Sequence, residues 1–436
     1  MRQYDWNDLG AAERQALLRR PALARDDELK ARVAEIVAEV RRDGDAALRR
    51  LTREIDGIEI GALEVGEGEL DDAERALTEA QRDAIRAAAR NIETFHRAQL
   101  PRDLDLETAA GVRCERLSRP IRRVGLYVPA GSAPLPSTAL MLGIPAKLAG
   151  CETRILCSPP QRNGRVDPAV LFAARVAGVT RVFRVGGAHA IAAMAYGTES
   201  VPKVYKIFGP GNTWVTAAKD LVDADPGGAA RDYPAGPSEV LVIADDGANP
   251  AFVASDLLSQ AEHGGDSQVL LITTSRRLAA AVAAEVDAQK AKLSRRDTVE
   301  AALAHSSIIV VDDLDAAVAI SNDYAPEHLI LQVEQPRRLL DGVEAAGSVF
   351  LGPWSPESVG DYCSGTNHVL PTYGYARRSS SLGVGDFLRS MTVQELSADG
   401  LRNIGPVAET LAELEGLDAH ARAVGTRLEA LGRSPR

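Results

Sequence analysis

Apolar and polar residues follow two different periods along the middle of the chain, and this pattern predicts alternating strands and helices. Short apolar runs such as RVGLYVP at 123–129 and EVLVIAD at 239–245 are typical of buried strands, whereas NTWVTAAKDLV at 212–222 carries apolar residues at helical spacing. Strand and helix candidates alternate with short connections up to residue 222, and a second series runs from 239 to 352. Such alternation predicts parallel sheets covered by helices.

The two series predict an α/β fold with two related parallel-sheet domains, each an incomplete Rossmann-like unit, and helical N- and C-terminal extensions. The expected divisions are an N-terminal helical extension (1–26), a helical part that packs with the second α/β domain (27–122), a first α/β domain (123–237), a second α/β domain (238–381) and a C-terminal helical tail (382–436). The irregular stretch at 98–120 could cross between domains. Active sites in such folds are expected at the carboxyl ends of the strands and between domains.

Composition and charge narrow the range of partners. Charged residues make up 25% of the chain, and 50 basic against 61 acidic residues leave a formal net charge of −11. This charge opposes binding to polyphosphate or anionic lipid, so neither nucleic acid nor a membrane is expected as a partner. The four cysteines form no CxxC pair, and the chain has neither a leader-like start nor a long apolar run. We therefore expect a cytoplasmic protein.

Candidate chemistry centres on NDYAPEHL at 322–329, which contains the adjacent pair Glu327 and His328. Pro326 biases Ala325 away from the α region, so the preceding helix should stop there, and the apolar residues that follow should form a buried strand. An imidazole titrates near neutrality, and a carboxylate beside it can orient water or hold a proton. Taken alone, such a pair is more often a surface feature after a turn.

Three further polar clusters contain histidine. Gln260 and His263 in SQAEHGGD are three residues apart and share one helical face. Asp361 and His368 lie in the Gly-rich segment GDYCSGTNHVLPT, and the third cluster, EGLDAH, holds Glu415 and His420. Two histidines, a carboxylate and a carbonyl oxygen could hold zinc or a similar ion.

Each of these residues also has a structural interpretation. Gln260 could cap the end of its helix, Asp361 could cap a turn, and His420 could simply pack against neighbouring side chains. Gln is moreover an uncommon zinc ligand, and the candidate positions are far apart in the sequence.

Two glycine-rich turns follow strand candidates in the first α/β domain. GPGN at 209–212 opens a helix, so its backbone N–H groups could meet an anionic group such as a pyrophosphate. Neither GPGN nor GGAHA at 186–190 matches GxGxxG. A tight turn between strand and helix explains both equally well.

Taken together, the motifs resemble the histidinol dehydrogenase family over most of the chain, from about 120 to 425. The segments that carry the resemblance are YVPAG (127–131), GGAHAIAAMAYGT (186–198), FGPGN (208–212), AGPSEVLVIAD (235–245), SQAEHG, NDYAPEHL, GDYCSGTNHVLPT, VGDF (384–387) and EGLDAH. Nine ordered motifs make a chance match negligible.

The resemblance implies a homodimer with one zinc ion per subunit. Such an enzyme oxidises L-histidinol to L-histidine through bound L-histidinal, with two NAD⁺, at the last step of histidine biosynthesis. The resemblance assigns NAD to the domain at 123–237, zinc and substrate to the domain at 238–381, and a reach to the partner subunit to the tail at 382–436.

Site residues follow from the matching positions, with Glu327 and His328 as the catalytic pair. The implied zinc ligands are Gln260, His263, Asp361 and His420, the last supplied by the partner subunit. The implied substrate contacts are Ser238, His368, Glu415, His328 and the four zinc ligands. The implied NAD contacts are Tyr127, His189 and Asn212.

One position departs from the family pattern, because His189 stands where Gln is usual. Histidine still donates and accepts hydrogen bonds, but it is shorter, planar and titratable, so cofactor affinity or its pH dependence can differ.

Three other functions fit part of the pattern. A paralogous dehydrogenase could use the same zinc and NAD on another small amino or sulfonated alcohol, although Ser238 and EGLDAH favour histidinol. A zinc hydrolase could use Glu327 to activate metal-bound water, with GPGN as a structural turn. A binding or scaffold protein with a degenerate site is disfavoured by the intact set of polar residues.

Overall fold

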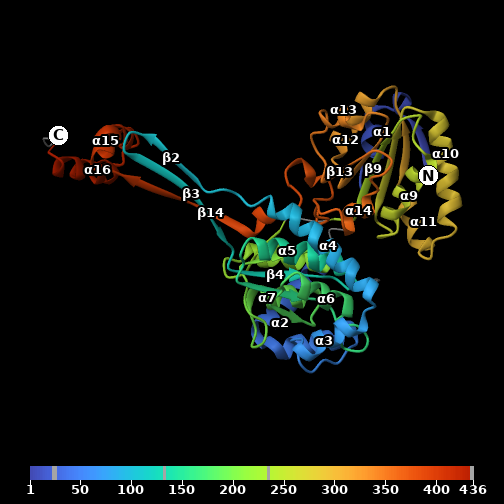
Figure 1. Ribbon diagram of the computed structural model, residues 1–436, viewed down its shortest axis with the longest axis horizontal. Coiled ribbons are helices and arrows are strands. Elements are labelled where there is room, and N and C mark those ends of the chain that lie inside the picture. Colours follow the sequence, from blue (N-terminus) through green and yellow to red (C-terminus); the bar gives the residue numbers. More distant parts are fainter. Residues whose placement is uncertain (22–26, 131–133, 233–235, 433–436) are drawn as a thin grey trace.

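Two parallel sheets and one long antiparallel arm organise the chain (Figure 1). The computed structural model describes residues 1–21, 27–130, 134–232 and 236–432. Each parallel sheet lies in its own lobe, and the arm extends from the lobe of the first sheet. The expectation of an α/β fold with two parallel-sheet domains is confirmed.

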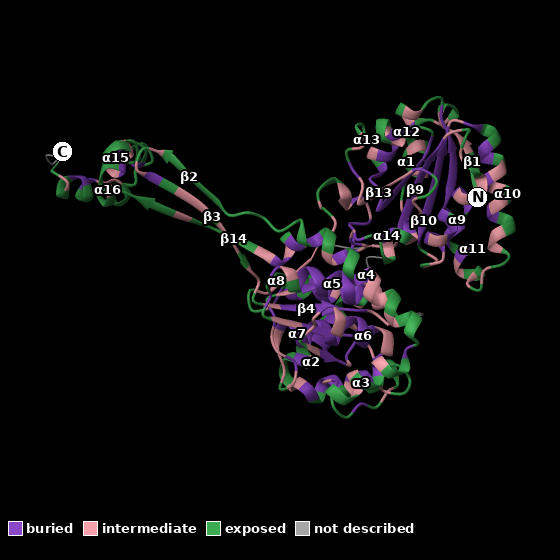
Figure 2. Cartoon of the chain, in the orientation of Figure 1, coloured by how far each residue is buried: buried purple, intermediate pink, exposed green. Residues whose placement is uncertain are grey.

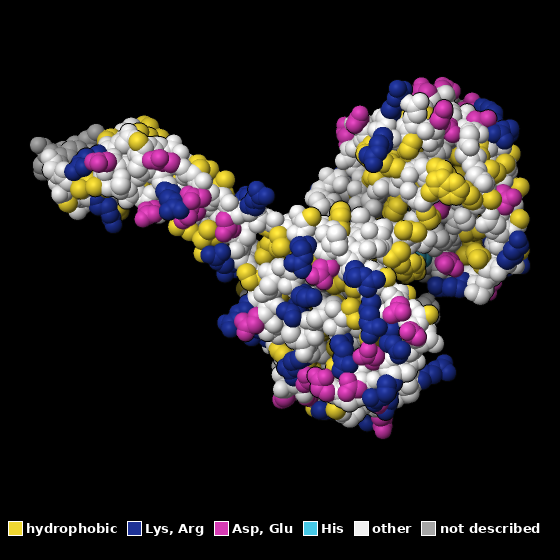
Figure 3. Space-filling view, in the orientation of Figure 1, with side chains coloured by type: hydrophobic (Ala, Val, Ile, Leu, Met, Phe, Trp, Pro, Cys, Tyr) yellow, Lys and Arg dark blue, Asp and Glu magenta, His cyan; other side chains and the backbone are white. Residues whose placement is uncertain are grey.

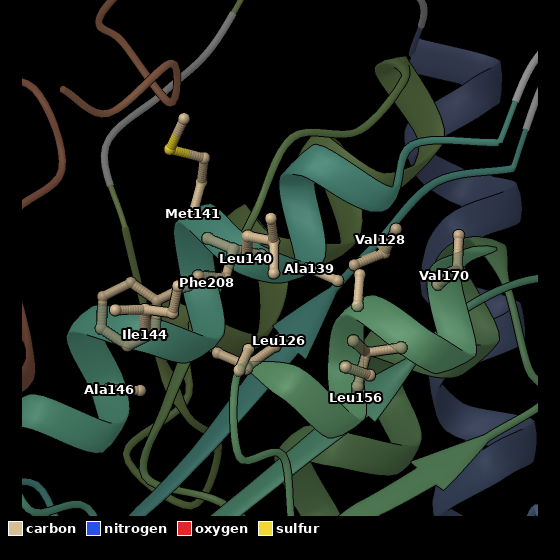
Figure 4. Close-up of a cluster of buried hydrophobic side chains, with 14 of the residues drawn as sticks. Leu126, Val128, Ala139, Leu140, Met141, Ile144, Ala146, Leu156, Val170 and Phe208 are labelled. Carbon is tan, nitrogen blue, oxygen red and sulfur yellow. The ribbon is translucent and has the colours of Figure 1, made fainter. Parts of the chain in front are cut away.

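The first sheet contains five parallel strands buried among helices. Its strands, in spatial order, are β6 (Arg181–Phe183), β5 (Thr153–Cys157), β4 (Arg123–Tyr127), β7 (Lys206–Phe208) and β8 (Ala230–Arg231). The helices that follow its strands are α5 (Pro136–Leu148), α6 (Pro168–Val176), α7 (Gly187–Tyr196) and α8 (Thr213–Ala224). Figure 4 shows Phe208 of β7 beside Leu140 of α5, in a cluster that also contains Leu126 and Leu156 of the strands, and this apolar packing fixes the helix on the sheet.

The N-terminal helices pack on this first sheet, which corrects the expectation that 27–122 packs with the second domain. These elements are α2 (Asp27–Leu51), the π-helical turn η2 (Thr52–Asp56), α3 (Glu67–Ala76) and α4 (Glu79–Arg97). Helix α2 packs against α7 and α8, α3 against α6, and α4 against α5. The reason is apolar: Val33 and Ile36 of α2 share a core with Ile155 and Ile207 of the strands.

The second sheet contains six parallel strands, and Figure 2 shows its centre as almost wholly buried. In spatial order its strands are β1 (Arg2–Asp5), β11 (Ser307–Val310), β10 (Gln268–Thr273), β9 (Glu239–Ala244), β12 (His328–Gln332) and β13 (Ser348–Leu351). The helices between them are α9 (Pro250–Ala261), α10 (Arg276–Lys290), α11 (Arg296–Ala304), α12 (Leu314–Tyr324) and α13 (Pro336–Leu340), and α14 (Glu357–Tyr362) follows β13.

The two sheets share one topology. Numbered within each domain, β4–β8 and β9–β13 both take the spatial order 3-2-1-4-5. The second sheet is extended at its edge by β1, so the N-terminal extension is not purely helical: β1 precedes η1 (Trp6–Asp8) and α1 (Ala11–Leu17).

The arm contains β2 (Leu104–Ala109), β3 (Val112–Pro120) and β14 (Leu388–Leu396), and it ends in α15 (Ala398–Leu414) and α16 (Asp418–Ala430). The stretch at 98–120 is therefore largely a hairpin rather than irregular, and the tail from 382 is not helical throughout. Sequence patterning missed these strands because their residues are mostly exposed on both faces, so they carry no apolar period of two.

None of the described helices is both long and apolar enough to cross a membrane. The four cysteines are all unpaired, in agreement with their spacing.

Candidate active site

The candidate site lies where the second domain docks on α4 and α5 of the first. Asn367 Nδ2 donates to the Met141 carbonyl at 2.8 Å, and Asn91 of α4 donates to the Cys363 carbonyl at 2.8 Å. Nearby, Thr138 Oγ1 lies 3.3 Å from the Nε2 of His368. These bonds tie the segment after α14 to the start of α5, which follows β4 at the carboxyl edge of the first sheet.

The position of the site in the second sheet corrects one expectation. His328 is the first residue of β12 and lies opposite Val240 near the start of β9. The Glu327–His328 pair therefore lies at the amino ends of these strands, and only the first sheet turns its carboxyl edge to the site. The first domain docks near the amino ends of β9 and β12, so the face between the two domains lies at that edge of the second sheet.

Glu327 and His328 are both held by the backbone of one residue on the neighbouring strand. Glu327 Oε2 accepts from the Glu239 N–H at 2.9 Å, and His328 Nδ1 donates to the Glu239 carbonyl at 3.0 Å. Helix α12 ends at Tyr324, its C-cap Ala325 lies in the left-handed region with φ 52°, and Pro326 follows. The predicted end of the helix is confirmed, although Ala325 adopts a conformation that L residues seldom take.

The hydrogen bond to Glu239 leaves the Nε2 of His328 available. This atom is buried without a hydrogen-bond partner among the residues that the structure describes, 3.5 Å from Asp361 Oδ1. Burial raises the pKa of Glu327 to about 8. Burial lowers the pKa of His328, but the charges of Glu357, Glu327 and Asp361 outweigh it, so the net shift of this pKa is upward.

A cluster of possible metal ligands adjoins this pair. One ligand atom each of His263, Glu357 and Asp361 lie within 4.8 Å of one another. Gln260, at the last turn of α9, is wholly buried beside Glu357. The structure thus brings Gln260 and His263 of one motif together with Asp361 of a distant motif.

Glu357 is a residue that the sequence analysis missed. It lies four residues before Asp361 on α14, so both carboxylates share one helical face. The spacing of these two carboxylates was the signal in the sequence that could have revealed Glu357. Glu357 is 1% exposed, and burial raises its pKa to about 8.

Two of the expected substrate contacts adjoin the same cluster. Ser238 Oγ lies 3.4 Å from the Nδ1 of His263. His368 Nδ1 donates to the backbone carbonyl of Asp361 at 2.8 Å.

Glu415 and His420 are not brought to the cluster within one chain. Both are exposed, on α16 and the turn before it, at the tip of the arm. Figure 1 shows that tip far from α9 and α14.

The expected cofactor residues belong to turns at the carboxyl edge of the first sheet. Tyr127 ends β4, and its hydroxyl accepts from the Gly187 N–H at 3.0 Å. Gly209 has φ 119°, and a Cβ there would overlap the Tyr127 carbonyl, so GPGN can approach β4 only with glycine at this position. Asn212 is exposed and caps α8, its Oδ1 accepting from the Val215 N–H at 3.1 Å.

His189, by contrast, points into the protein interior. It is 1% exposed, and its Nε2 lies 3.3 Å from Thr52 Oγ1 of η2. Thr52 donates its own proton to the Leu48 carbonyl at 2.8 Å, so His189 Nε2 must be the donor and its Nδ1 carries the lone pair. That Nδ1 is buried without a hydrogen-bond partner, and burial lowers the pKa of His189 to about 4.

The whole chain is similar to known proteins. The family model described as histidinol dehydrogenase matches residues 19–428. Histidinol dehydrogenase from Xanthomonas axonopodis pv. citri is 57% identical over 98% of this chain and 99% of the relative, and that from Vibrio vulnificus (strain YJ016) is 54% identical over 99% of both. The crystal structure of histidinol dehydrogenase from Elizabethkingia anophelis is similar with a TM-score of 0.96, at 45% identity and 99% coverage of both chains.

Proposed function

The chain belongs to the histidinol dehydrogenase family of oxidoreductases, and we propose that it oxidises L-histidinol through L-histidinal to L-histidine with two NAD⁺. The reaction is the last step of histidine biosynthesis. One observation carries the proposal: a buried Glu-His pair and a cluster of possible metal ligands meet at the interdomain face.

The donor set fits zinc. Imidazole nitrogen and carboxylate oxygen are usual zinc ligands, and three such atoms lie within 4.8 Å of one another. Gln260, His263, Asp361 and His420 of the partner subunit would hold the ion. Zinc, when bound, supplies a template that fixes the amino and imidazole groups of the substrate.

His328 is the base in both oxidation steps. Its Nε2 takes the hydroxyl proton of the alcohol while hydride leaves the same carbon for NAD⁺, which gives the aldehyde. In the neutral imidazole the Glu239 carbonyl holds the proton on Nδ1, so Nε2 carries the lone pair that the reaction needs.

Glu327 acts between the two oxidations. It orients a water molecule and takes its proton as the oxygen adds to the aldehyde carbon, while His328 returns its proton to the carbonyl oxygen, which yields the hydrate and restores His328 as a base. His328 then serves again while hydride passes to the second NAD⁺. Burial makes the Glu327 carboxylate a stronger base than an exposed one, which suits this task.

The remaining expected residues bind the two substrates. Ser238 and His368, beside the metal cluster, hold the amino alcohol together with Glu415 of the partner subunit. Tyr127, His189 and Asn212 hold NAD⁺. Tyr127 acts by stabilising a turn at the carboxyl edge of the first sheet, and His189 acts by its position in that turn.

We further propose a homodimer in which the arm of each subunit completes the site of the other. Figure 3 shows apolar side chains along the arm. Val407, Leu411 and Leu414 on α15 are 60%, 54% and 79% exposed in the single chain. Such a row of apolar side chains is typical of a helix that packs against another subunit.

The test is an assay of the purified protein with zinc, NAD⁺ and L-histidinol that counts NADH formed per molecule of substrate consumed. Two NADH per histidinol support the proposal. No NADH from histidinol, or NADH from another small amino alcohol only, would contradict it.

A further inference from the structure

We propose that Arg20, in the N-terminal segment, is a positioning residue for the catalytic pair Glu327 and His328. The inference rests on the proposed function of that pair. Arg20 touches neither catalytic side chain, and it acts through the strand and the turn that hold them.

The first contact is with Glu239. The Arg20 guanidinium binds the Glu239 carboxylate with two nitrogens, Nε to Oε1 and Nη2 to Oε2, the latter at 2.8 Å. The side chains are only 11% and 2% exposed. Since the backbone N–H and carbonyl of Glu239 bind Glu327 and His328, Arg20 anchors the residue on which both catalytic side chains rest.

The second contact is with the turn that leads into the catalytic pair. Arg20 Nη2 also donates to the carbonyls of Tyr324 at 2.7 Å and Ala325 at 3.3 Å. Ala325 has φ 52° and ψ 69°, a left-handed conformation that is strained for alanine and that the surroundings must hold in place. One guanidinium therefore bridges β9 and the end of α12.

Arginine suits this position better than lysine. The Arg20 guanidinium carbon lies 3.9 Å from the ring centroid of Tyr324, so the planar group stacks on the ring while its edge donates. A lysine ammonium keeps the charge but cannot bind both carboxylate oxygens, reach the carbonyls and stack at once.

The same segment contains a matched control. Arg14 stacks on Trp6 at 4.9 Å, and its Nε donates to the Trp6 carbonyl at 3.0 Å. These contacts stabilise the N-terminal segment in its docked conformation, but both lie within the segment and do not reach the catalytic turn. Arg14→Met therefore tests loss of docking without loss of the bridge to the catalytic turn.

The experiment compares full-length wild type, Arg20→Met, Arg20→Lys and Arg14→Met. For each protein, kcat and KM are measured with L-histidinol and with L-histidinal, along with KM for NAD⁺, zinc content and thermal midpoint. We expect Arg20→Met to lower kcat for both substrates by roughly tenfold to a hundredfold, because a displacement of about 1 Å at reacting groups has that effect. Zinc content and KM for NAD⁺ should not change, Arg20→Lys should recover part of kcat, and Arg14→Met should keep the wild-type kcat.

A double variant guards against misfolding. Arg20→Met leaves the buried Glu239 charge unpaired, whereas Arg20→Met with Glu239→Gln removes that charge. The double variant should fold and show the same loss of kcat as the single one. Wild-type kcat in the folded double variant, or an equal loss in Arg14→Met, would overturn the proposal. Wild-type protein that forms no NADH from L-histidinol would instead refute the proposed function itself.

Discussion

The side-chain amide of Gln260 faces the carboxylate of Glu357, and with its nitrogen turned toward that carboxylate it donates to both oxygens, to Oε2 at 2.9 Å. In its ionised form Glu357 only accepts hydrogen bonds, so the carboxylate determines which end of the amide is nitrogen. The amide oxygen of Gln260 is consequently left for the zinc ion that we propose.

This relationship predicts that Glu357 sets zinc affinity through Gln260. Glu357→Ala should weaken zinc binding about tenfold to a hundredfold, the usual effect of removing a group that orients a ligand. Glu357→Gln should weaken zinc binding less, because its amide oxygen can still accept from Gln260. Zinc affinity is measured by competition with a chelator of known strength, and Glu262→Gln, at the carboxylate that precedes His263 in the chain, serves as control. If both Glu357 variants lost zinc affinity equally, and by more than this range, the result would mean that Glu357 binds the ion directly.

The division of labour between Glu327 and His328 predicts different losses in the two half-reactions. Glu327→Gln should impair oxidation of L-histidinal more than oxidation of L-histidinol, because only the second step adds water. His328→Asn should impair both steps, each by about a hundredfold or more. Rates with each substrate, followed as NADH, decide the matter. Equal losses in the two steps for Glu327→Gln would count against the scheme.

Metal removal should abolish turnover, and zinc should restore it. His263→Ala and His420→Ala should each lower the zinc content of the purified dimer, because each removes one proposed ligand. If both variants retain full zinc, the ligand assignment is wrong.

Mixing these two inactive variants tests the shared site. A hybrid dimer has one site with both ligands missing and one site that is intact, so mixing after reversible dissociation should recover about a quarter of wild-type activity. No recovery in confirmed hybrid dimers would show that the partner's His420 does not complete the site.

His189 should influence NAD⁺ binding in a way that does not depend on pH near neutrality. Burial lowers its pKa to about 4, so its imidazole is neutral at higher pH. His189→Gln should therefore change KM for NAD⁺ by the same factor at all pH values from about 6 to 9. A ratio of variant to wild-type KM that titrates within this range would show that the imidazole gains a proton there.

The ionised Asp256 side chain should lower the free energy of unfolding at neutral pH. Burial raises its pKa to about 6, above the ordinary 3.8, so the folded state binds a proton more tightly than the unfolded state. The stability that this proton contributes is present below pH 3.8 and is lost as pH rises through 6. Asp256→Asn should then raise the free energy of unfolding at pH 7.5 by about 1–3 kcal/mol.

The local contacts favour the same substitution. Gln332 Nε2 donates to Asp256 Oδ2 at 2.9 Å, while the buried Gln332 Oε1 lacks a hydrogen-bond partner that an asparagine amide could supply. Urea unfolding at pH 5 and pH 7.5 measures the effect, and the gain should be smaller at pH 5. Asp246→Asn is a control that should lower the free energy of unfolding instead, since a hydrogen bond from Arg277 lowers the pKa of that exposed carboxyl. Unchanged stability of Asp256→Asn at both pH values would refute the prediction.

Sequence patterning predicted those parts of the fold whose signals are local. Strands buried on both faces, such as β9 and β12, appear as short apolar runs, and amphipathic helices between them show their own period. The Glu327–His328 pair could be found because a proline, a helix end and a strand start meet within a few residues. The strands of the arm left no such signal, because neither of their faces is wholly buried.

The sequence by itself determined the α/β class, the two βα series and the residue types available for catalysis, since each depends on neighbours along the chain. Tertiary structure alone decided which sheet the N-terminal helices cover, that the site lies at the amino ends of β9 and β12, and that Glu357 and Arg20 belong to its surroundings. Those relationships join groups separated by tens to hundreds of residues. Apolar packing and docking of the two domains bring such groups together, and no local period in a sequence records that outcome.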